Sequence, residues 1–560
     1  MVAGGSKWPS TLYPAPVTRF AHALTLVLAV ALSAGLASQG AALGPSSPGD
    51  RGARPRRDDL DARRLTARRG PIRDPSIRTR QSGAPGSTQV PVPEASFLGI
   101  PGKGNIAPSD TTGAAGTSRV VTAVNIDYAV WDKAAAAVPT TAPAPLVAGS
   151  LESLAPGLPG GAFVFDPKVV YDPYRGRFVI AFLAGHGPPF TPGFRKSWIV
   201  VVSIPEATAT DPGTWCRRVL RGDHVRGNGS QFADYPGLGL DKKRVYVTTN
   251  QFRFGGGERF EYAQILAISK SSLYRCGKRP RIVVFAGDDT RDPRRGQAFT
   301  IQPAITETDT GANPPQYLVS FQDRSCGPAC GKRLTVWRIK DRRRKGLQLS
   351  SDAIGVGTSR VAPLGTQKDG SPSCAPVEHC WDTGDLRLVT AFFDADRGRL
   401  YTAHAVRADV APGDGYLESV VSWYEIDPSP IRRARVTRRG SLGDSGRDAG
   451  WPAMATDGLG NLVITYSRAG APLPGEYLSA VAATIPPGAL APDAVTVLTP
   501  GEAPYIAIGG RPQRWGDFAA ANRDPVDPAD VWLIAQYARA DGDGSHTPLW
   551  QQVVHRVSFA

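Results

Sequence analysis

The chain has 560 residues, with 65 Lys+Arg against 50 Asp+Glu and a formal net charge of +15. Its 62 Gly and 50 Pro make up 20% of the residues, against roughly 12% in an average protein. This density argues against a helical bundle and predicts many short elements joined by turns. The positive charge raises the question of nucleic acid, but no helix-turn-helix, zinc-finger or RNA-binding motif accompanies it. We therefore expect no nucleic-acid partner.

The first segment reads as an export signal. An apolar run from Phe20 to Ala37 follows two basic residues, and small residues suited to cleavage follow it between positions 37 and 42. Residues 1–42 are therefore predicted to be a signal peptide, and the mature protein to be secreted, extracellular and without a stable membrane span. The alternative is an uncleaved N-terminal membrane anchor, because about 18 apolar residues can just span a bilayer.

Residues 43–96 are predicted to be a disordered linker rich in Arg, Pro and Gly. Between Arg51 and Arg80 there are eleven Arg and four Asp, a surplus of 11 − 4 = +7, with almost no large apolar residues. Such a composition cannot bury enough surface to offset chain entropy. The linker is either a solvated spacer or an attachment to acidic wall polymers or anionic lipid.

The rest of the chain, 97–560, is organised by an internal repeat. A segment of alternating small and apolar residues runs into an Asp, turns and continues as a β-rich stretch. Clear copies are YPGLGLDKKRVYVTTN from Tyr235, WPAMATDGLGNLVITYS from Trp451 and DPKVVYDPYRGRFVIAF from Asp166. The turn aspartates Asp172, Asp241, Asp309, Asp394, Asp457 and Asp524 are separated by 69, 68, 85, 63 and 67 residues. Alternation on both sides of such a turn predicts a β-hairpin.

A second strand motif lies between successive copies, for example SWIVVVSIPEA from Ser197 and VVSWYEIDPS from Val420. Each unit thus offers three to four strands, and seven units can be distinguished. The pattern predicts an all-β fold, a single β-propeller of seven four-stranded blades, with six blades as the alternative. The last strand matches the third-strand motif, so we expect a strand from residues 89–100 to close the ring. We expect a monomer.

These repeats carry a family resemblance. PSDTTGAAG, FDPKVVYDPYRGRFVIAF, ADYPGLGLDKKRVYVTTNQF and RWGDFAAANRDPVDPADVWLIAQY resemble repeats of secreted bacterial β-propeller proteins of the sialidase-like or BNR-repeat-like group, over residues 105–560. The resemblance implies the architecture. It leaves two functions open: an extracellular binding or scaffold module for a glycan, peptide or cell-wall ligand, and a sialidase-like glycoside hydrolase.

The sequence favours the binding module over the enzyme. The Arg-Ile-Pro segment of sialidases and their Ser-x-Asp-x-Gly-x-Thr-Trp turn are both absent, as are His-Glu-x-x-His and Gly-x-Ser-x-Gly. The 52 Arg are too many for an arginine triad to be recognised by position. No cofactor is required by any motif.

Six cysteines in an exported chain indicate disulfides. We expect Cys326–Cys330 and Cys374–Cys380 to staple loops and Cys216–Cys276 to join neighbouring loops. A zinc site is the rival interpretation, since His379 adjoins Cys380, but no Cys-x2-Cys pair is present.

The candidate ligand site is a set of acids at one repeat position. Asp110, Asp234 and Asp517 each precede the turn position of their unit by seven residues, and Asp166 precedes it by six. At the start of a channel-lining strand they would meet on one rim and bind Ca²⁺ or a cationic ligand group, with Tyr235 and Trp515 as a surface for a sugar. The alternative is that each Asp caps a local turn and each ring packs between blades.

Overall fold

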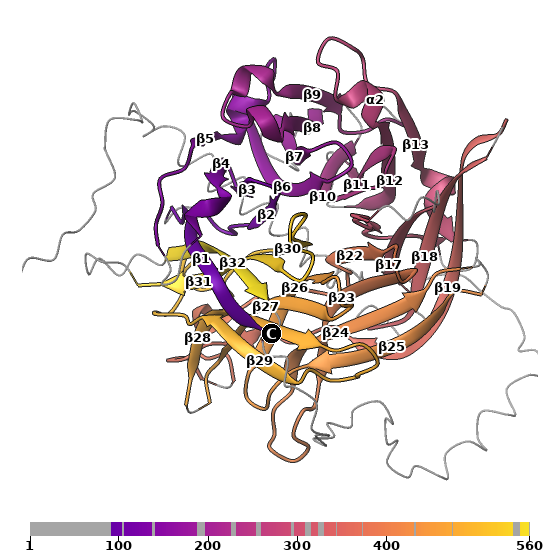
Figure 1. Ribbon diagram of the computed structural model, residues 1–560. Coiled ribbons are helices and arrows are strands. Elements are labelled where there is room, and N and C mark those ends of the chain that lie inside the picture. The colour runs from indigo at the N-terminus through magenta and orange to yellow at the C-terminus, as the bar shows by residue number, and fades with distance from the viewer. Residues whose placement is uncertain are drawn as a thin grey trace, which may run out of the picture.

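A computed structural model describes residues 91–558, except 104–105, 137–140, 187–195, 226–230, 254–258, 293–295, 309–314, 323–329, 343, 372, 430–432, 473 and 541–548. These residues form seven four-stranded antiparallel sheets arranged as blades around a central axis (Figure 1). The prediction of an all-β, seven-bladed propeller is confirmed, and the six-bladed alternative is wrong. The predicted signal peptide and the arginine-rich segment 51–80 lie outside the described residues.

Blades 1 to 6 are each a meander of four strands in chain order. Blade 1 consists of β2 (Thr112–Ala115), β3 (Arg119–Val124), β4 (Asp127–Asp132) and β5 (Val147–Ser150). Blade 2 consists of β6 (Ala162–Asp172), β7 (Arg177–His186), β8 (Lys196–Pro205) and β9 (Cys216–Arg221). Blade 3 consists of β10 (Gln231–Leu240), β11 (Arg244–Arg253), β12 (Phe260–Ser269) and β13 (Ile282–Ala286). Blade 4 consists of β16 (Gln302–Pro303), β17 (Gln316–Gln322), β18 (Cys330–Arg342) and β19 (Gly346–Arg360). Blade 5 consists of β22 (Thr390–Asp394), β23 (Arg399–Ala408), β24 (Glu418–Asp427) and β25 (Arg435–Leu442). Blade 6 consists of β26 (Asp448–Thr456), β27 (Leu462–Gly470), β28 (Glu476–Ile485) and β29 (Ala494–Thr499).

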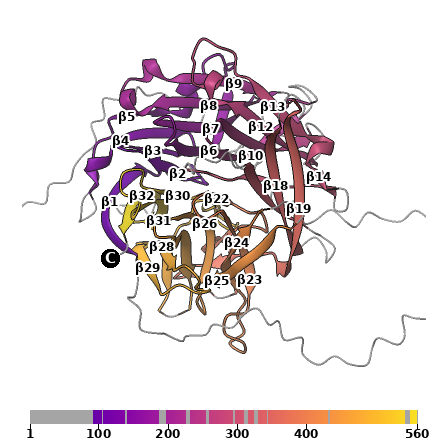
Figure 2. The ribbon, with the colours of Figure 1, turned by 45° about the vertical axis from the view of Figure 1, so that its right-hand side comes forward.

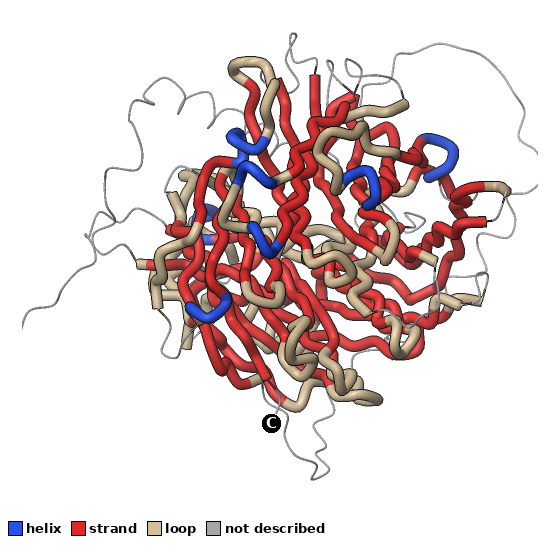
Figure 3. Tube along the Cα trace, turned by 45° about the horizontal axis from the view of Figure 1, so that its top comes forward, coloured by secondary structure: helices blue, strands red, loops and turns tan. Residues whose placement is uncertain are grey.

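Blade 7 joins the two ends of the described chain. It contains β30 (Ala520–Arg523), β31 (Val531–Arg539), β32 (Leu549–Ser558) and, as its outer strand, β1 (Val92–Pro101), which pairs with β32 antiparallel. The prediction that a strand near 89–100 closes the ring is therefore confirmed. The remaining elements are short: the helix α2 (Lys270–Leu273), a few 3-10 turns and the two-residue strands β14 (Arg291–Asp292), β15 (Gly296–Gln297), β20 (Gly365–Thr366) and β21 (Cys380–Trp381) (Figure 3).

The first strand of every blade lines the central axis, and the blades radiate from it (Figure 2). Small residues such as Gly113, Ala453 and Ala521 face the axis and allow the strands to come close together. A Cβ added at Gly239 would lie 2.5 Å from the carbonyl oxygen of Ala304 in the next blade. The space left has a volume of about 50 Å³, far below the roughly 300–1,000 Å³ of ligand pockets. Side chains therefore fill most of the space between these first strands.

The faces of the blades bury their apolar residues against one another. Val121 and Val130 of blade 1, for example, share one cluster with Val169, Phe178 and Val200 of blade 2, and all five are buried. Alternation of apolar residues along twisted strands supplies such faces to both neighbours of a blade. The described part of the chain contains no helix with the length and hydropathy of a membrane span.

The predicted turn aspartates lie between the first and second strands of their blades. In Asp172, Asp241, Asp394, Asp457 and Asp524, one carboxylate oxygen accepts a backbone N–H two or three residues further on. This contact stabilises the turn itself, while in several cases the other oxygen binds the next blade. Asp309 lies outside the described residues.

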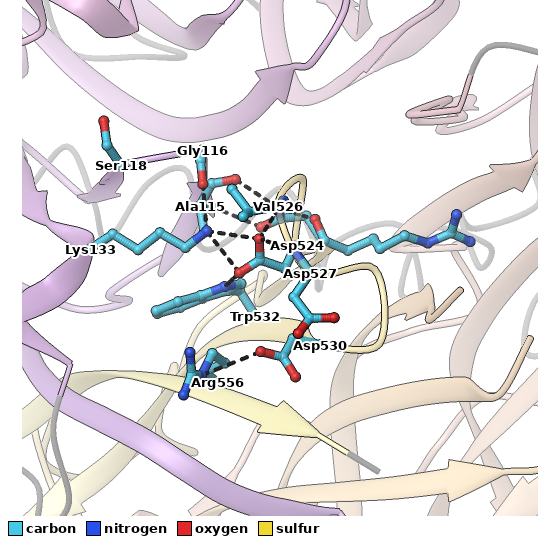
Figure 4. A network of polar contacts seen from close by, with 12 residues as sticks. Ala115, Gly116, Ser118, Lys133, Asp524, Val526, Asp527, Asp530, Trp532 and Arg556 are labelled. Carbon is cyan, nitrogen blue, oxygen red and sulfur yellow. Dashed lines mark hydrogen bonds and ion pairs between the residues drawn. The ribbon is translucent and has the colours of Figure 1, made fainter. Parts of the chain in front are cut away.

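Asp524 shows how this contact crosses the ring closure (Figure 4). Its carboxylate accepts from Trp532 Nε1 at 2.6 Å within blade 7 and lies 2.7 Å from Lys133 Nζ of blade 1. Lys133 also donates to the carbonyl of Gly116 at 2.8 Å. The ion pair is largely buried, with side-chain exposures of 11% for Lys133 and 3% for Asp524, so loss of either partner would leave an uncompensated charge.

Two of the three expected disulfides are confirmed. Cys216 at the start of β9 bonds Cys276 in the following blade, and Cys374 bonds Cys380 in the connection between blades 4 and 5. Cys326 lies outside the described residues, so the pair Cys326–Cys330 stays a prediction. Disulfides are consistent with an extracellular protein.

Candidate functional site

The starts of the first strands meet at one mouth of the central axis, and four aspartates lie there together. Asp110 precedes β2, Asp166 lies in β6, Asp234 in β10 and Asp517 precedes β30. These four, termed here the mouth cluster, are close enough for their charges to act on one another. The arrangement of repeats around a ring thus brings residues more than 400 positions apart into one site.

Hydrogen bonds hold the cluster in place. Asp110 accepts from the side-chain amide of Asn125 at 2.6 Å and from the backbone N–H of Asp517 at 2.9 Å. The side-chain oxygen of Asn125 in turn accepts from the backbone N–H of Asp166 at 2.8 Å. Asp110 and Asp166 also interact carboxyl to carboxyl. Three blades are therefore joined through three aspartates and one asparagine.

The backbone at this mouth is strained in a repeated way. Asp166 and Tyr235 have φ values of 53° in bulges of β6 and β10, and Trp451 of blade 6 has a φ of 54° in the corresponding bulge of β26. Asp110 has a φ of 47°. Non-glycine residues avoid this left-handed region at a cost of about 1–3 kcal/mol each. Bulges re-aim side chains, and the same backbone feature recurs at the entrance of these blades.

Three cations of the chain accompany the acids. Arg514 Nη2 lies 2.8 Å from Asp517 Oδ1, and Arg387 Nη2 lies 2.7 Å from Asp385 Oδ2. Lys168, two residues after Asp166, places its Nζ 3.2 Å from the centre of the Phe518 ring. Counting Asp382 and Asp385 with the mouth cluster, six acids face three bases. The site is therefore acidic, and both guanidinium groups are already paired.

Burial and mutual repulsion shift the titration of these groups. Burial, with repulsion from Asp517, raises the pKa of Asp110 to about 6. Burial also raises the pKa of Asp234 to about 6 against the attraction of Arg387. The pKa of Asp166 is raised well above its usual range by burial and by its three acidic neighbours. Packing around the Lys168 ammonium lowers its pKa to about 7 despite the nearby acids. Burial and repulsion from the neighbouring acids thus favour the protonated form of Asp166.

Part of the cluster is accessible from the mouth. Asp166, Asp234 and Arg387 are partly exposed, and the side chains of Asp382 and Asp385 are 31% and 30% exposed. Asp110 and Asp517 lie deeper, at 1% and 8%. The Tyr505 hydroxyl is buried and has no hydrogen-bond partner among the described residues, although Asp110 and Arg514 lie near it. A buried hydroxyl without a partner marks a place for a water or ligand atom.

The aromatic rings of the site pack inside it. Trp515 is fully buried, donates from Nε1 to Ser467 Oγ at 2.8 Å and contacts Tyr505. Tyr235 is 3% exposed, lies edge-on to Phe518 with ring centroids 5.1 Å apart, and is covered by the Arg387 guanidinium at 4.3 Å. Both rings thus pack between blades, the alternative to a sugar-binding surface. Tyr235 borders the mouth cluster, and Trp515 packs behind it.

No three Asp, Glu, His or Cys side chains among the described residues are grouped so as to hold a metal ion. In the mouth cluster the carboxylates instead accept hydrogen bonds from N–H groups and interact with the cations Arg387, Arg514 and Lys168. Binding of Ca²⁺ there stays a prediction.

The sequence pattern pointed to the acids but not to their partners. Arg514 lies three residues before Asp517 and Lys168 two after Asp166, a proximity that could have been noticed. Asp382, Asp385 and Arg387 arrive from the long connection between β19 and β22. The repeat position seven residues before Asp394 is occupied there by Arg387, and Asp385 precedes Asp394 by nine residues. Asn125 and Tyr505 stand outside the repeat position that revealed the aspartates.

Comparison with known proteins finds distantly similar solved structures. No family model and no curated protein matches the chain. Solved structures similar to it include a protein of unknown function from Dyadobacter fermentans, with 12% identity and a TM-score of 0.36 over 71% of this chain and 100% of that one. A Trypanosoma rangeli sialidase bound to the inhibitor DANA has 9% identity and a TM-score of 0.32, over 70% and 54%. An α-L-arabinofuranosidase from Fusarium graminearum has 11% identity and a TM-score of 0.34, over 69% and 93%.

Proposed function

We propose that the chain is an extracellular glycoside hydrolase of the sialidase-like propeller type, acting on a neutral glycan at the mouth cluster. The observation that carries the proposal is the pairing of Asp166, whose protonated form is favoured by burial and by its acidic neighbours, with carboxylates whose pKa is about 6, among them Asp234, in a partly exposed site. Glycosidic hydrolysis needs two carboxyl groups in opposite protonation states.

Asp166 would serve as the general acid. Its proton passes to the glycosidic oxygen as the bond to the anomeric carbon breaks. Asp234 would take a proton from the water that attacks the same carbon, so that both products end in a hydroxyl group. Arg387 favours the ionised form of Asp234. The buried Asp110 holds Asp166 protonated by its charge and through Asn125 keeps it in position.

The excess of acidic over basic side chains at the mouth favours a neutral sugar over an anionic one. A sialic acid carboxylate is usually held by unpaired arginine forks. Here Arg387 contacts Asp385 and Arg514 contacts Asp517, and six acids outnumber three bases around the site. An anionic sugar would be repelled, whereas the hydroxyl groups of a neutral sugar can bond to carboxylates and guanidinium groups alike.

The test is hydrolysis of a panel of neutral polysaccharides and aryl glycosides, with a fluorogenic sialoside alongside. We expect activity on at least one neutral substrate, none on the sialoside, and a loss of about 10²–10⁴-fold in Asp166→Asn and Asp234→Asn. The exposed Asp493, which directly precedes the outer strand β29 of blade 6, provides the control Asp493→Asn, which should be fully active. Hydrolysis of the sialoside alone would overturn the charge argument.

A second function is favoured by the small volume at the axis. Without a deep pocket the mouth could bind a glycan without cleaving it, as an extracellular binding module does. A glycan array probed with wild-type protein and Asp166→Asn separates the two. If the protein hydrolyses no substrate of the panel and Asp166→Asn binds glycan as tightly as the wild type does, the binding module is the better interpretation.

A further inference from the structure

Two loops on the far face of the propeller carry dense positive charge. The first strand of each blade leaves the mouth, the second returns and the third leaves again, so connections between third and fourth strands lie on the opposite face. In blade 3 this connection, residues 274–281, exposes Arg275, Lys278, Arg279 and Arg281. In blade 4 the corresponding turn joins β18 and β19.

The β18–β19 turn adds a second group. Lys340, Arg342, Arg344 and Lys345 are all exposed at the end of this long hairpin, which reaches out beside β13 of blade 3 (Figure 1). The eight side chains of the two loops are termed here the basic face.

Contacts within the protein make the basic face continuous. The carbonyl of Arg281 accepts from Ser269 N at 3.0 Å, and the next residue, Lys270, donates its N–H to Lys243 O at 3.1 Å. Beside Lys243, the Arg244 guanidinium lies 2.8 Å from Asp341 of the hairpin. The blade 3 loop and the blade 4 hairpin are therefore joined by a short chain of bonds rather than lying at separate corners of the molecule.

The basic face is also fixed in shape. The disulfide Cys216–Cys276 ties the blade 3 loop to the outer strand of blade 2, and at the hairpin tip Lys345 N donates to Arg342 O at 3.0 Å. Neighbouring carboxylates are engaged elsewhere: Asp172 with Lys270, and Asp341 with Arg244. A preformed surface with such an excess of cations attracts a polyanion at little conformational cost.

We propose that the basic face binds a linear acidic polysaccharide. Among the described residues of the two loops, none is an exposed aromatic side chain on which nucleic-acid bases could stack. None is a large exposed apolar side chain either; the nearest, Val283, lies in β13. A membrane-surface site would need such apolar groups to insert. Regularly spaced anionic groups on a polysaccharide need only the cations. This inference is independent of the activity proposed for the mouth.

The test uses the full chain and polygalacturonate, with its fully methyl-esterified form as the neutral counterpart. We expect binding to the acid form only, lost when NaCl rises from about 0.05 M to about 0.5 M because screening shortens the reach of the charges. The variant Lys340→Gln, Arg342→Gln, Arg344→Gln and Lys345→Gln should bind about tenfold more weakly. The control replaces four exposed basic residues of the other face or its loops, Lys196, Arg253, Arg407 and Arg511, and should bind as wild type.

The arginine-rich segment 51–80 is the main competitor for the same ligand. A third variant, with its eleven Arg changed to Gln, separates the two. Retained binding in that variant supports the basic face. Loss of binding there with wild-type affinity in the hairpin variant would overturn the proposal, and so would equal weakening in the hairpin and control variants. Tighter binding to duplex DNA or to anionic phospholipid vesicles than to polygalacturonate would also overturn it.

Discussion

The side-chain amide of Asn125 lies 2.6 Å from the Asp110 carboxylate, to which it donates a hydrogen bond. Its oxygen accepts from the N–H of Asp166 in the next blade. Asn250 of blade 3 repeats the second contact, since its oxygen accepts from the N–H of Thr300 at 2.8 Å at the entrance of blade 4. The propeller thus uses one amide to position the backbone of the following blade, and at blade 1 the same amide also orients an acid.

The first prediction separates these two duties. Asn125→Leu removes the donor to Asp110 and the acceptor for Asp166, and should lower the free energy of unfolding by about 2–4 kcal/mol. It should also raise the pKa of Asp110 further, because a bond to the ionised form is lost. Asn250→Leu is the matched control. We expect urea denaturation to show a similar loss of stability in both variants and NMR titration to show the pKa change only in Asn125→Leu. An unchanged Asp110 titration in Asn125→Leu would contradict this assignment.

The second prediction concerns pH. Because the pKa of Asp110 rises from 3.8 in the unfolded chain to about 6 in the fold, the folded protein binds more protons between these values. Its contribution to stability is complete below pH 3.8 and is lost as pH rises through 6, by about 3 kcal/mol at most. Asp110→Asn should remove this dependence. Urea denaturation of both proteins between pH 4 and 7 checks the sign, and identical pH profiles would show that Asp110 does not titrate in this way.

The features that could be predicted from the sequence are those that recur with the period of the blades. The turn aspartates recur with the blade, and each bonds its own turn, so a local signal led to the correct number of blades. The rim position of Asp110, Asp166, Asp234 and Asp517 followed from the same period, because equivalent positions meet on a closed ring. The equivalent position of blade 5 holds Arg387 instead of an acid, so the recurrence of acids did not reveal it, and its contact with Tyr235 of blade 3 is fixed by tertiary packing.

The burial of Trp515 is a second feature that the sequence alone could not predict. A tryptophan beside a rim acid can face solvent or pack between blades, and its sequence context is the same in both cases. In the structure its indole N–H finds Ser467 of the preceding blade. That partner stands 48 residues earlier in the chain, so the choice between the two became visible only with the fold.

The third prediction compares the two disulfides. Cys216–Cys276 closes a loop of 60 residues and Cys374–Cys380 one of 6. Chain-entropy arguments assign roughly 4 kcal/mol of stabilisation to the longer loop and about 2 kcal/mol to the shorter. We therefore expect the double variant Cys216→Ala, Cys276→Ala to lower the thermal midpoint by more than Cys374→Ala, Cys380→Ala. Thermal unfolding under non-reducing conditions measures both, and the reverse order would show that native-state contacts outweigh loop entropy here.

The fourth prediction tests the closure of the ring by β1. Without residues 1–101, β32 loses its antiparallel partner, and the side chain of Gln552 loses the N–H of Ile100, which it accepts at 3.2 Å. Blade 7 would then end in an unpaired edge, which favours aggregation. Deletion of residues 1–90 leaves β1 in place and is the matched control. We expect the control to melt as the full chain does, and the longer deletion to lose most of its β circular dichroism or its cooperative transition. Addition of a peptide spanning 89–103 should restore that transition, since β1 pairs with β32 only through backbone hydrogen bonds and local side chains. A longer deletion that melts like the control would show that the other six blades hold blade 7 without β1.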